Sequence, residues 1–254
     1  MDSKQRFSSR VEDYIKYRPG YPPGVLETLR AECGLSAAST VADIGSGTGL
    51  LSRLLLDAGC RVFGVEPNPE MRAAGERLLA GYPHFTSLAG SAEESGLSKA
   101  SVDFVTAGQA FHWFDPARAR AEFQRILKPG GWTALVWNSR REDTSPFLRD
   151  YNNLLKTYGS DYSQVNHRNV EENPEIIPNF FGGAHRFARF DNVQVFDFPA
   201  LRGRLMSSSY VPEPGQPNHA PMLAELHRIF DLYQQDGTVA LEYDTRLYYG
   251  KLSG

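Results

Sequence analysis

The sequence predicts an α/β protein built on a doubly wound, mostly parallel sheet of seven strands, with an antiparallel strand near one edge and a helical cap. Two observations predict this class. Between about residues 24 and 138, short and continuously apolar runs alternate with helical patterns, as in strands buried on both faces and covered by helices. Near the C-terminus, apolar and polar residues alternate from Val239 to Tyr249, which is typical of a half-solvated antiparallel strand.

The N-terminal half divides into a leader, residues 1–23, and a core, residues 24–138. In the leader, Phe7, Val11, Tyr14 and Ile15 have helical spacing, and the proline-rich stretch at 18–23 must end that helix. The expected strands of the core are 40–44, 61–66, 84–89, 102–107 and 132–138. The expected helices lie near 48–58, 68–81 and 116–127.

The pattern changes after Asn138, so residues 139–254 are treated as a third segment. Apolar residues from Phe147 to Tyr158 fit an amphipathic helix that ends at Gly159. Residues 160–184 have no clear period, and we interpret about 139–184 as an inserted cap. One or two strands at 187–198, a helix at 222–233 and the final strand would complete the sheet.

The composition of the chain argues against several classes of protein. The chain has 254 residues, 41% of them hydrophobic, and a formal net charge of -3, so no nucleic-acid partner is expected. Its two cysteines exclude a disulfide scaffold or a cysteine-rich metal cluster, and its six histidines lack the spacing of metal ligands. No secretory signal or membrane-spanning run is found. We therefore expect a soluble, cytoplasmic monomer or homodimer with no metal and no membrane partner.

The most informative segment is a glycine-rich turn between a strand and a helix. Residues 41–51 read VADIGSGTGLL, in which Gly45, Gly47 and Gly49 would let the backbone approach a ligand at the carboxyl end of the sheet. Glu66 ends the next strand, 21 residues after Gly45, where an acid can accept hydrogen bonds from both hydroxyls of a ribose. This spacing predicts a Rossmann-like sheet that binds a nucleoside-containing cofactor.

Two residues favour S-adenosylmethionine over a dinucleotide. The dinucleotide fingerprint requires glycine where this chain has Leu50. Asp43 precedes the loop, and its carboxylate suits an ammonium group better than a pyrophosphate.

Four segments together resemble the class I S-adenosylmethionine-dependent methyltransferases. They are VADIGSGTGL at 41–50, GVEPN at 64–68, GSAE at 90–93 and LKPGG at 127–131. The resemblance implies that the methionine end of the cofactor lies against Asp43, Gly45, Ser46 and Gly47, and that Glu66 holds the ribose. It further implies an adenine site formed by Pro67, Asn68, Met71, Ala92 and Glu93.

The leader and the loop after the fourth expected strand resemble a subgroup of type 11 methyltransferases that includes trans-aconitate methyltransferase-like enzymes. The matching motifs are RPGYP at 18–22 and QAFHWF at 109–114. In that subgroup the N-terminal segment folds over the cofactor, so residues 1–23 are expected to act as a lid. The resemblance places Tyr14, Arg18 and Gln109 near the cofactor, and it implies an acceptor site formed by Tyr17, Tyr21, Trp113 and Tyr210.

The predicted reaction is in-line methyl transfer to a small-molecule acceptor, such as a carboxylate or hydroxyl. Gln109 and His112 are the candidate catalytic residues, and His112 would be the base if the acceptor needs one. Phe114 is expected to pack under the following helix. The alternatives are a non-catalytic sensor or scaffold that binds S-adenosylmethionine and, less favoured, an NAD-type oxidoreductase.

Overall fold

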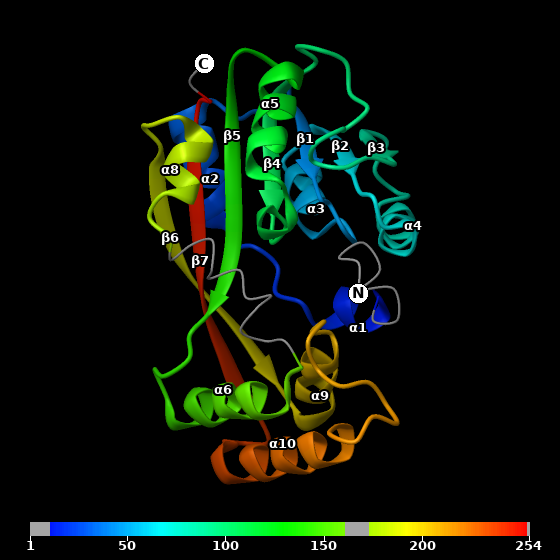
Figure 1. Ribbon diagram of the computed structural model, residues 1–254, viewed down its shortest axis with the longest axis vertical. Coiled ribbons are helices and arrows are strands. Elements are labelled where there is room, and N and C mark those ends of the chain that lie inside the picture. Colours follow the sequence, from blue (N-terminus) through cyan, green and yellow to red (C-terminus); the bar gives the residue numbers. More distant parts are fainter. Residues whose placement is uncertain (1–10, 161–172, 253–254) are drawn as a thin grey trace.

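A seven-stranded sheet organises the computed structural model, which describes residues 11–160 and 173–252 (Figure 1). The strand order is β3-β2-β1-β4-β5-β7-β6. In chain order, the strands are β1 (Thr40–Ile44), β2 (Arg61–Val65), β3 (Phe85–Leu88), β4 (Val102–Gly108), β5 (Leu127–Arg140), β6 (Arg186–Phe196) and β7 (Val239–Gly250). The pairings from β3 through β5 are parallel, whereas β7 is antiparallel to both β5 and β6.

Helices cover both faces of the parallel strands. On one face, α2 (Pro23–Cys33) and α3 (Leu50–Asp57) contribute to a core with β1, β2 and β4. On the other face, α5 (Pro116–Ile126) and α8 (Ile176–Phe181) form a second core that includes Phe123 and Phe180. The helix α4 (Pro69–Leu78) packs beside β3. Because both faces are covered, β1 and β4 are buried over most of their length, as the sequence predicted, whereas β3 at the edge of the sheet is only partly buried.

A helical lobe lies beyond the parallel strands (Figure 1). It contains α6 (Pro146–Tyr158), α9 (Phe198–Met206) and α10 (His219–Tyr233), which share an apolar core with ends of β6 and β7. The helix α1 (Val11–Tyr17) contacts α9, so the described part of the leader, residues 11–23, lies between this lobe and the sheet.

The predicted sheet is confirmed, with local differences. The strand β5 begins at Leu127, before the predicted 132, because Leu127 already pairs with Val102. The region 187–198, expected to hold one or two strands, holds the one edge strand β6 and ends at the first residue of α9, while β7 lies one position inside that edge. Within the unpatterned region 160–184, α8 packs on α5 rather than in the helical lobe, while residues 161–172 lie outside the described part of the chain.

Among the described residues, no helix combines the length and apolar character needed to cross a bilayer.

Candidate functional site

The glycine loop after β1 lies against the loop after β4. The backbone amides of Gly45 and Ser46 donate hydrogen bonds to the carbonyl of Val65, at 2.8 and 3.1 Å. Gly45 has a φ of +67°, and an added Cβ would lie 2.6 Å from the Cβ of Ala110. Glycine is therefore required at this position by both backbone conformation and space.

Glu66 joins the end of β2 to this loop. Its carboxylate accepts backbone hydrogen bonds from Gly47 at 2.8 Å and from Asn68 at 2.9 Å. Burial raises the pKa of Glu66, and the two amides and Arg72 oppose that shift. A carboxylate has about four acceptor sites, so about two remain for a ligand's hydroxyls.

Asp43 lies under the loop rather than on its surface. The side chain is 1% exposed, and its carboxylate accepts hydrogen bonds from Ser52 Oγ at 2.6 Å and Thr106 Oγ1 at 3.1 Å. Burial raises its pKa to about 6, against the opposing effect of the two hydroxyls. Both carboxylate oxygens therefore bind the protein, and contact with a ligand's ammonium group stays a prediction.

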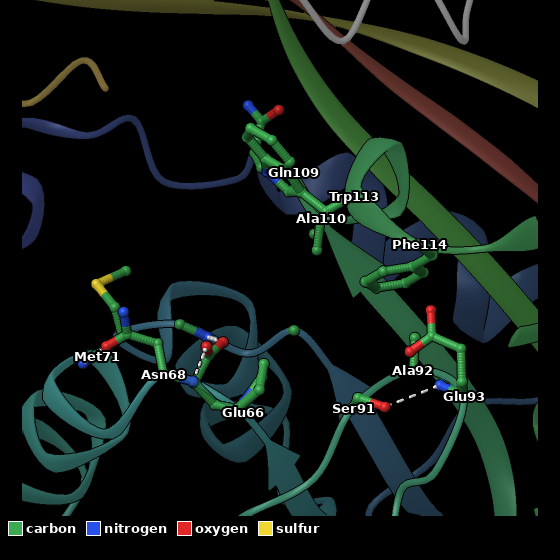
Figure 2. Close-up of a pocket in the computed structure, with 14 residues that line it drawn as sticks. Glu66, Asn68, Met71, Ser91, Ala92, Glu93, Gln109, Ala110, Trp113 and Phe114 are labelled. Carbon is green, nitrogen blue, oxygen red and sulfur yellow. Dashed lines mark hydrogen bonds between the residues drawn. The ribbon is translucent and has the colours of Figure 1, made fainter. Parts of the chain in front are cut away.

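A pocket that is partly open to solvent lies in front of the loop (Figure 2). We call it the main pocket. Glu66, Asn68 and Met71 lie on one side, the loop after β4 lies opposite, and Ser91, Ala92 and Glu93 form a third wall. Its lining comprises Gly45, Gly47, Glu66, Pro67, Asn68, Met71, Ser91, Ala92, Glu93, Gly108, Gln109, Ala110, Trp113 and Phe114. Eight of the predicted cofactor residues other than Gln109 line it, and Asp43 and Ser46 border a smaller neighbouring pocket instead.

Local hydrogen bonds fix two walls of the main pocket. Asn68 caps α4, with its Oδ1 accepting from the amide of Met71 at 2.9 Å. Glu93 accepts from the amide of Asp115 at 3.0 Å, which ties the third wall to the start of α5. The lining positions are thereby held in place by contacts within the protein.

The loop after β4 combines backbone strain with aromatic packing. Gln109 has a φ of +57°, which is uncommon for a residue other than glycine, and its Nε2 donates to the carbonyl of Asn138 at 3.2 Å. Such conformations concentrate at functional sites. Trp113 and Phe114 line the pocket, while Phe111 is buried in the core. Phe114 also packs against that core, as predicted.

His112 has the environment of a weak base. It lies in the short helix η3 (Phe111–Trp113) but does not line either pocket described here. Burial, together with the positive charge of Arg18, lowers its pKa to about 3. An efficient general base has a pKa near the working pH, so this geometry weighs against the predicted proton transfer by His112.

The leader reaches the site through Arg18 and Tyr21. Both line the smaller pocket, which we call the side pocket, together with Asp43, Ser46 and part of the glycine loop. The side chain of Tyr14 lies outside the described part of the structure. Tyr17 and Tyr210 pack instead on the core of the helical lobe, and neither lines the main or the side pocket.

Several lining residues were not predicted from the sequence. In the main pocket they are Ser91, Gly108, Ala110 and Phe114, and in the side pocket they are Pro19, Thr48, Leu50 and Leu51. Each is close in sequence to a motif that was recognised. The signal was membership of a recognised segment for Pro19, Thr48, Leu50 and Ser91. For Gly108 and Ala110 it was their position at the carboxyl end of β4.

Comparisons with known proteins agree with this geometry. Residues 42–135 match the family model described as a methyltransferase domain. An uncharacterized methyltransferase of Schizosaccharomyces pombe is 34% identical over 204 residues, which cover 80% of this chain and 77% of the relative. An uncharacterized methyltransferase of Mycobacterium tuberculosis is 44% identical over 141 residues, 56% of this chain and 55% of the relative, so the match spans about half of that protein.

A solved structure extends the likeness to the whole fold. A methyltransferase from Anaeromyxobacter dehalogenans superposes with a TM-score of 0.68 at 23% identity, covering 93% of this chain and 98% of its own. The assignment to a trans-aconitate-like subgroup stays a prediction. With its cofactor-binding sheet and these relatives, the chain belongs to the class I S-adenosylmethionine-dependent methyltransferases.

Proposed function

We propose that this protein transfers the methyl group of S-adenosylmethionine to the oxygen of a small-molecule acceptor, a carboxylate or a hydroxyl. The observation that carries the proposal is the position of Glu66. Its buried carboxylate is fixed by Gly47 and Asn68 at the end of β2 and lines the main pocket. A fixed acid there suits the two hydroxyls of a ribose.

The residues present fit the cofactor. Gly45 and Gly47 have positive φ values and line the main pocket without side chains that would fill it. Glu66 would hold the ribose, and Asn68, Met71 and Ala92 would border the adenine. The sulfonium of S-adenosylmethionine supplies an activated methyl group, which leaves the protein to orient the acceptor and exclude water.

The acceptor side of the site would be formed by the loop after β4 and by the leader. Gln109 lines both pockets, so its amide can position a group at their junction. Trp113 presents an aromatic side chain to the main pocket, where a ring face favours a nearby cation. Arg18 and Tyr21 would border the acceptor from the leader.

The low pKa of His112 favours an acceptor that needs no general base. A carboxylate is already ionised at neutral pH and can act as the nucleophile directly. A hydroxyl acceptor would instead lose its proton to water or to a group other than His112.

Binding and turnover together test the proposal. Isothermal titration should show binding of S-adenosylhomocysteine, with no comparable binding of NADH. Incubation with S-adenosylmethionine that carries a tritiated methyl group should label members of a panel of carboxylic acids and alcohols. Tight binding without labelling would support a sensor or scaffold, and preferential binding of NADH would overturn the assignment.

A further inference from the structure

A buried asparagine near the end of β5 uses its full capacity for hydrogen bonds. Asn138 is 4% exposed. Its Oδ1 accepts hydrogen bonds from Thr245 Oγ1 at 2.5 Å and from Asn192 Nδ2 at 3.1 Å. Its Nδ2 donates to the carbonyls of Gly20 at 3.1 Å and Pro19 at 3.4 Å. The side chain of asparagine has two donor hydrogens and two acceptor lone pairs, so these four contacts satisfy it completely.

The two carbonyls that Asn138 binds belong to the leader, in the stretch that lines the side pocket. Arg18, Pro19 and Tyr21 all line that pocket. The leader approaches the end of β4 closely at this place, because a Cβ added to Gly108 would lie 2.5 Å from the hydroxyl oxygen of Tyr21. The hydrogen bonds from Asn138 therefore hold the leader where it contributes to the wall of the side pocket.

The main chain of the same asparagine holds another residue of that wall. The carbonyl of Asn138 accepts a hydrogen bond from Gln109 Nε2 at 3.2 Å. The backbone amide of Gln109 donates to the carbonyl of Val136 at 2.9 Å, so Gln109 is bound to β5 at two points. Gln109 lines both pockets, whereas Asn138 lines neither. Asn138 thus contacts the leader and Gln109 together, from outside the cavity.

We propose that Asn138 is a positioning residue that holds the leader against the loop after β4 and thereby sets the shape of the side pocket. This inference rests on the proposed function, in which Arg18 and Tyr21 border the acceptor. The position requires donors toward two leader carbonyls and an acceptor toward the hydroxyl of Thr245, which an asparagine supplies. An aspartate of the same shape would turn an anionic oxygen toward the carbonyls, and an apolar side chain would leave them without these donors.

The contact should affect ligand binding through the fraction of molecules in which the leader is docked. If only part of the population has the leader in place, the apparent dissociation constant rises by the inverse of that fraction. A ligand that contacts the leader then spends part of its binding free energy on ordering it. Loss of the contact from Asn138 should therefore release the leader and weaken ligand binding together.

The test compares Asn138→Asp with Thr245→Val in the full chain. Thr245→Val is the matched control, because it removes a hydrogen bond from the same buried cluster but leaves both bonds from Asn138 to the leader. Trypsin cleavage after Lys16, which is exposed on α1, measures release of the leader, and mass spectrometry identifies the cleaved bond. Isothermal titration with S-adenosylhomocysteine measures affinity, and circular dichroism checks that each variant is folded.

Without ligand, Asn138→Asp should be cleaved after Lys16 at least about tenfold faster than the wild type, since two hydrogen bonds to the leader are lost. Its affinity for S-adenosylhomocysteine should be lower by about fivefold or more, because binding must also order the leader. Thr245→Val should stay within about twofold of the wild type in both measurements, although its melting temperature falls. If Asn138 had a merely structural role, the two variants would behave alike.

Two results would overturn the assignment. Equal cleavage rates in Asn138→Asp and Thr245→Val would show that Asn138 does not hold the leader. Faster cleavage with unchanged affinity would show that the position of the leader does not shape the ligand site. If Asn138→Asp fails to fold, Asn138→Ala carries the same comparison without an added charge. Failure of S-adenosylhomocysteine to bind the wild type would instead contradict the proposed function, while the cleavage comparison, which needs no ligand, would still test the contact.

Discussion

The carboxylate of Glu66 accepts a hydrogen bond from the backbone amide of Gly47 at 2.8 Å, which joins the end of β2 to the glycine loop. A direct contact thus fixes Glu66, which is predicted to bind the ribose, relative to the glycine loop, which is predicted to bind the methionine end of the cofactor.

Replacing Glu66 tests the ribose assignment. Glu66→Ala should weaken the binding of S-adenosylhomocysteine by about 1–3 kcal/mol, the usual range for charged hydrogen bonds, while the protein stays folded. Isothermal titration measures the affinity and circular dichroism checks the fold. Glu94→Ala is the control, because Glu94 is an exposed acid on a neighbouring loop. An unchanged affinity in Glu66→Ala would contradict the assignment.

Adding one methyl group at Gly45 should damage both the loop and the pocket. An alanine there must adopt a φ of +67° and would approach the Cβ of Ala110 to 2.6 Å. The left-handed backbone alone costs about 1–2 kcal/mol, so thermal unfolding should occur at a lower temperature, and S-adenosylhomocysteine should bind more weakly. Gly81→Ala is the control, since an added Cβ there has no neighbour within 4 Å. Equal effects of the two substitutions would show that the close approach is unimportant.

The buried carboxyl of Asp43 should make stability depend on pH. The pKa of this carboxyl is about 6 in the native protein, whereas an aspartate in the unfolded chain has the ordinary value of 3.8. Between about pH 4 and pH 6 the native protein therefore holds a proton that the unfolded chain has released. This contribution to stability is present below pH 4 and is lost as the pH rises through 6.

Asp43→Asn removes that contribution. The stability of the variant relative to wild type should therefore increase by up to about 3 kcal/mol between pH 4 and pH 7. Urea unfolding at both pH values measures the difference. If the difference in stability between variant and wild type does not depend on pH, the carboxyl of Asp43 is ionised in the native protein at both pH 4 and pH 7.

The leader should be protected by the cofactor and by the sheet. Asn192 Nδ2 donates to the carbonyl of Gly20 at 2.9 Å, and Gln194 Nε2 donates to the carbonyl of Tyr17 at 3.1 Å. Loss of one hydrogen bond costs about 1 kcal/mol, so Asn192→Ala should be cleaved by trypsin after Lys16 about fivefold faster than wild type. Asn153→Ala, an exposed position on α6, should not differ from wild type.

The same assay tests the predicted lid. S-adenosylhomocysteine should slow cleavage after Lys16 in the wild type if the leader folds over the cofactor. Equal rates with and without this ligand would contradict the lid.

His112 should remain neutral across the physiological range. Its pKa of about 3 predicts that its ring proton resonances do not shift between pH 5 and pH 8 in nuclear magnetic resonance spectra. His112→Asn identifies those resonances by their loss. A titration with a midpoint near 6 or 7 would restore His112 as a candidate base.

Local sequence signals predicted the parallel sheet well, and they failed where tertiary contacts override propensity. The prolines at 22 and 23 were interpreted only as the end of the leader helix, yet Pro23 also begins α2, because proline is favoured in a first helical turn. The helix α9 was missed, in part because it contains Gly203, a poor helix former. That glycine is required by packing, since an added Cβ would lie 2.0 Å from the ring of Tyr17.

The sequence by itself determined the succession of strands and helices along the core, the glycine loop and the position of Glu66 at the end of a strand, because these depend on hydrophobic period and on residues close together in the chain. Only the tertiary structure decided the environments of His112 and Asn138. The low pKa of His112 depends on burial and on Arg18, from the leader. The hydrogen-bond partners of the Asn138 side chain come from the leader, β6 and β7. Charge and solvation at such sites are set by neighbours that are distant in the chain, and no local pattern encodes them.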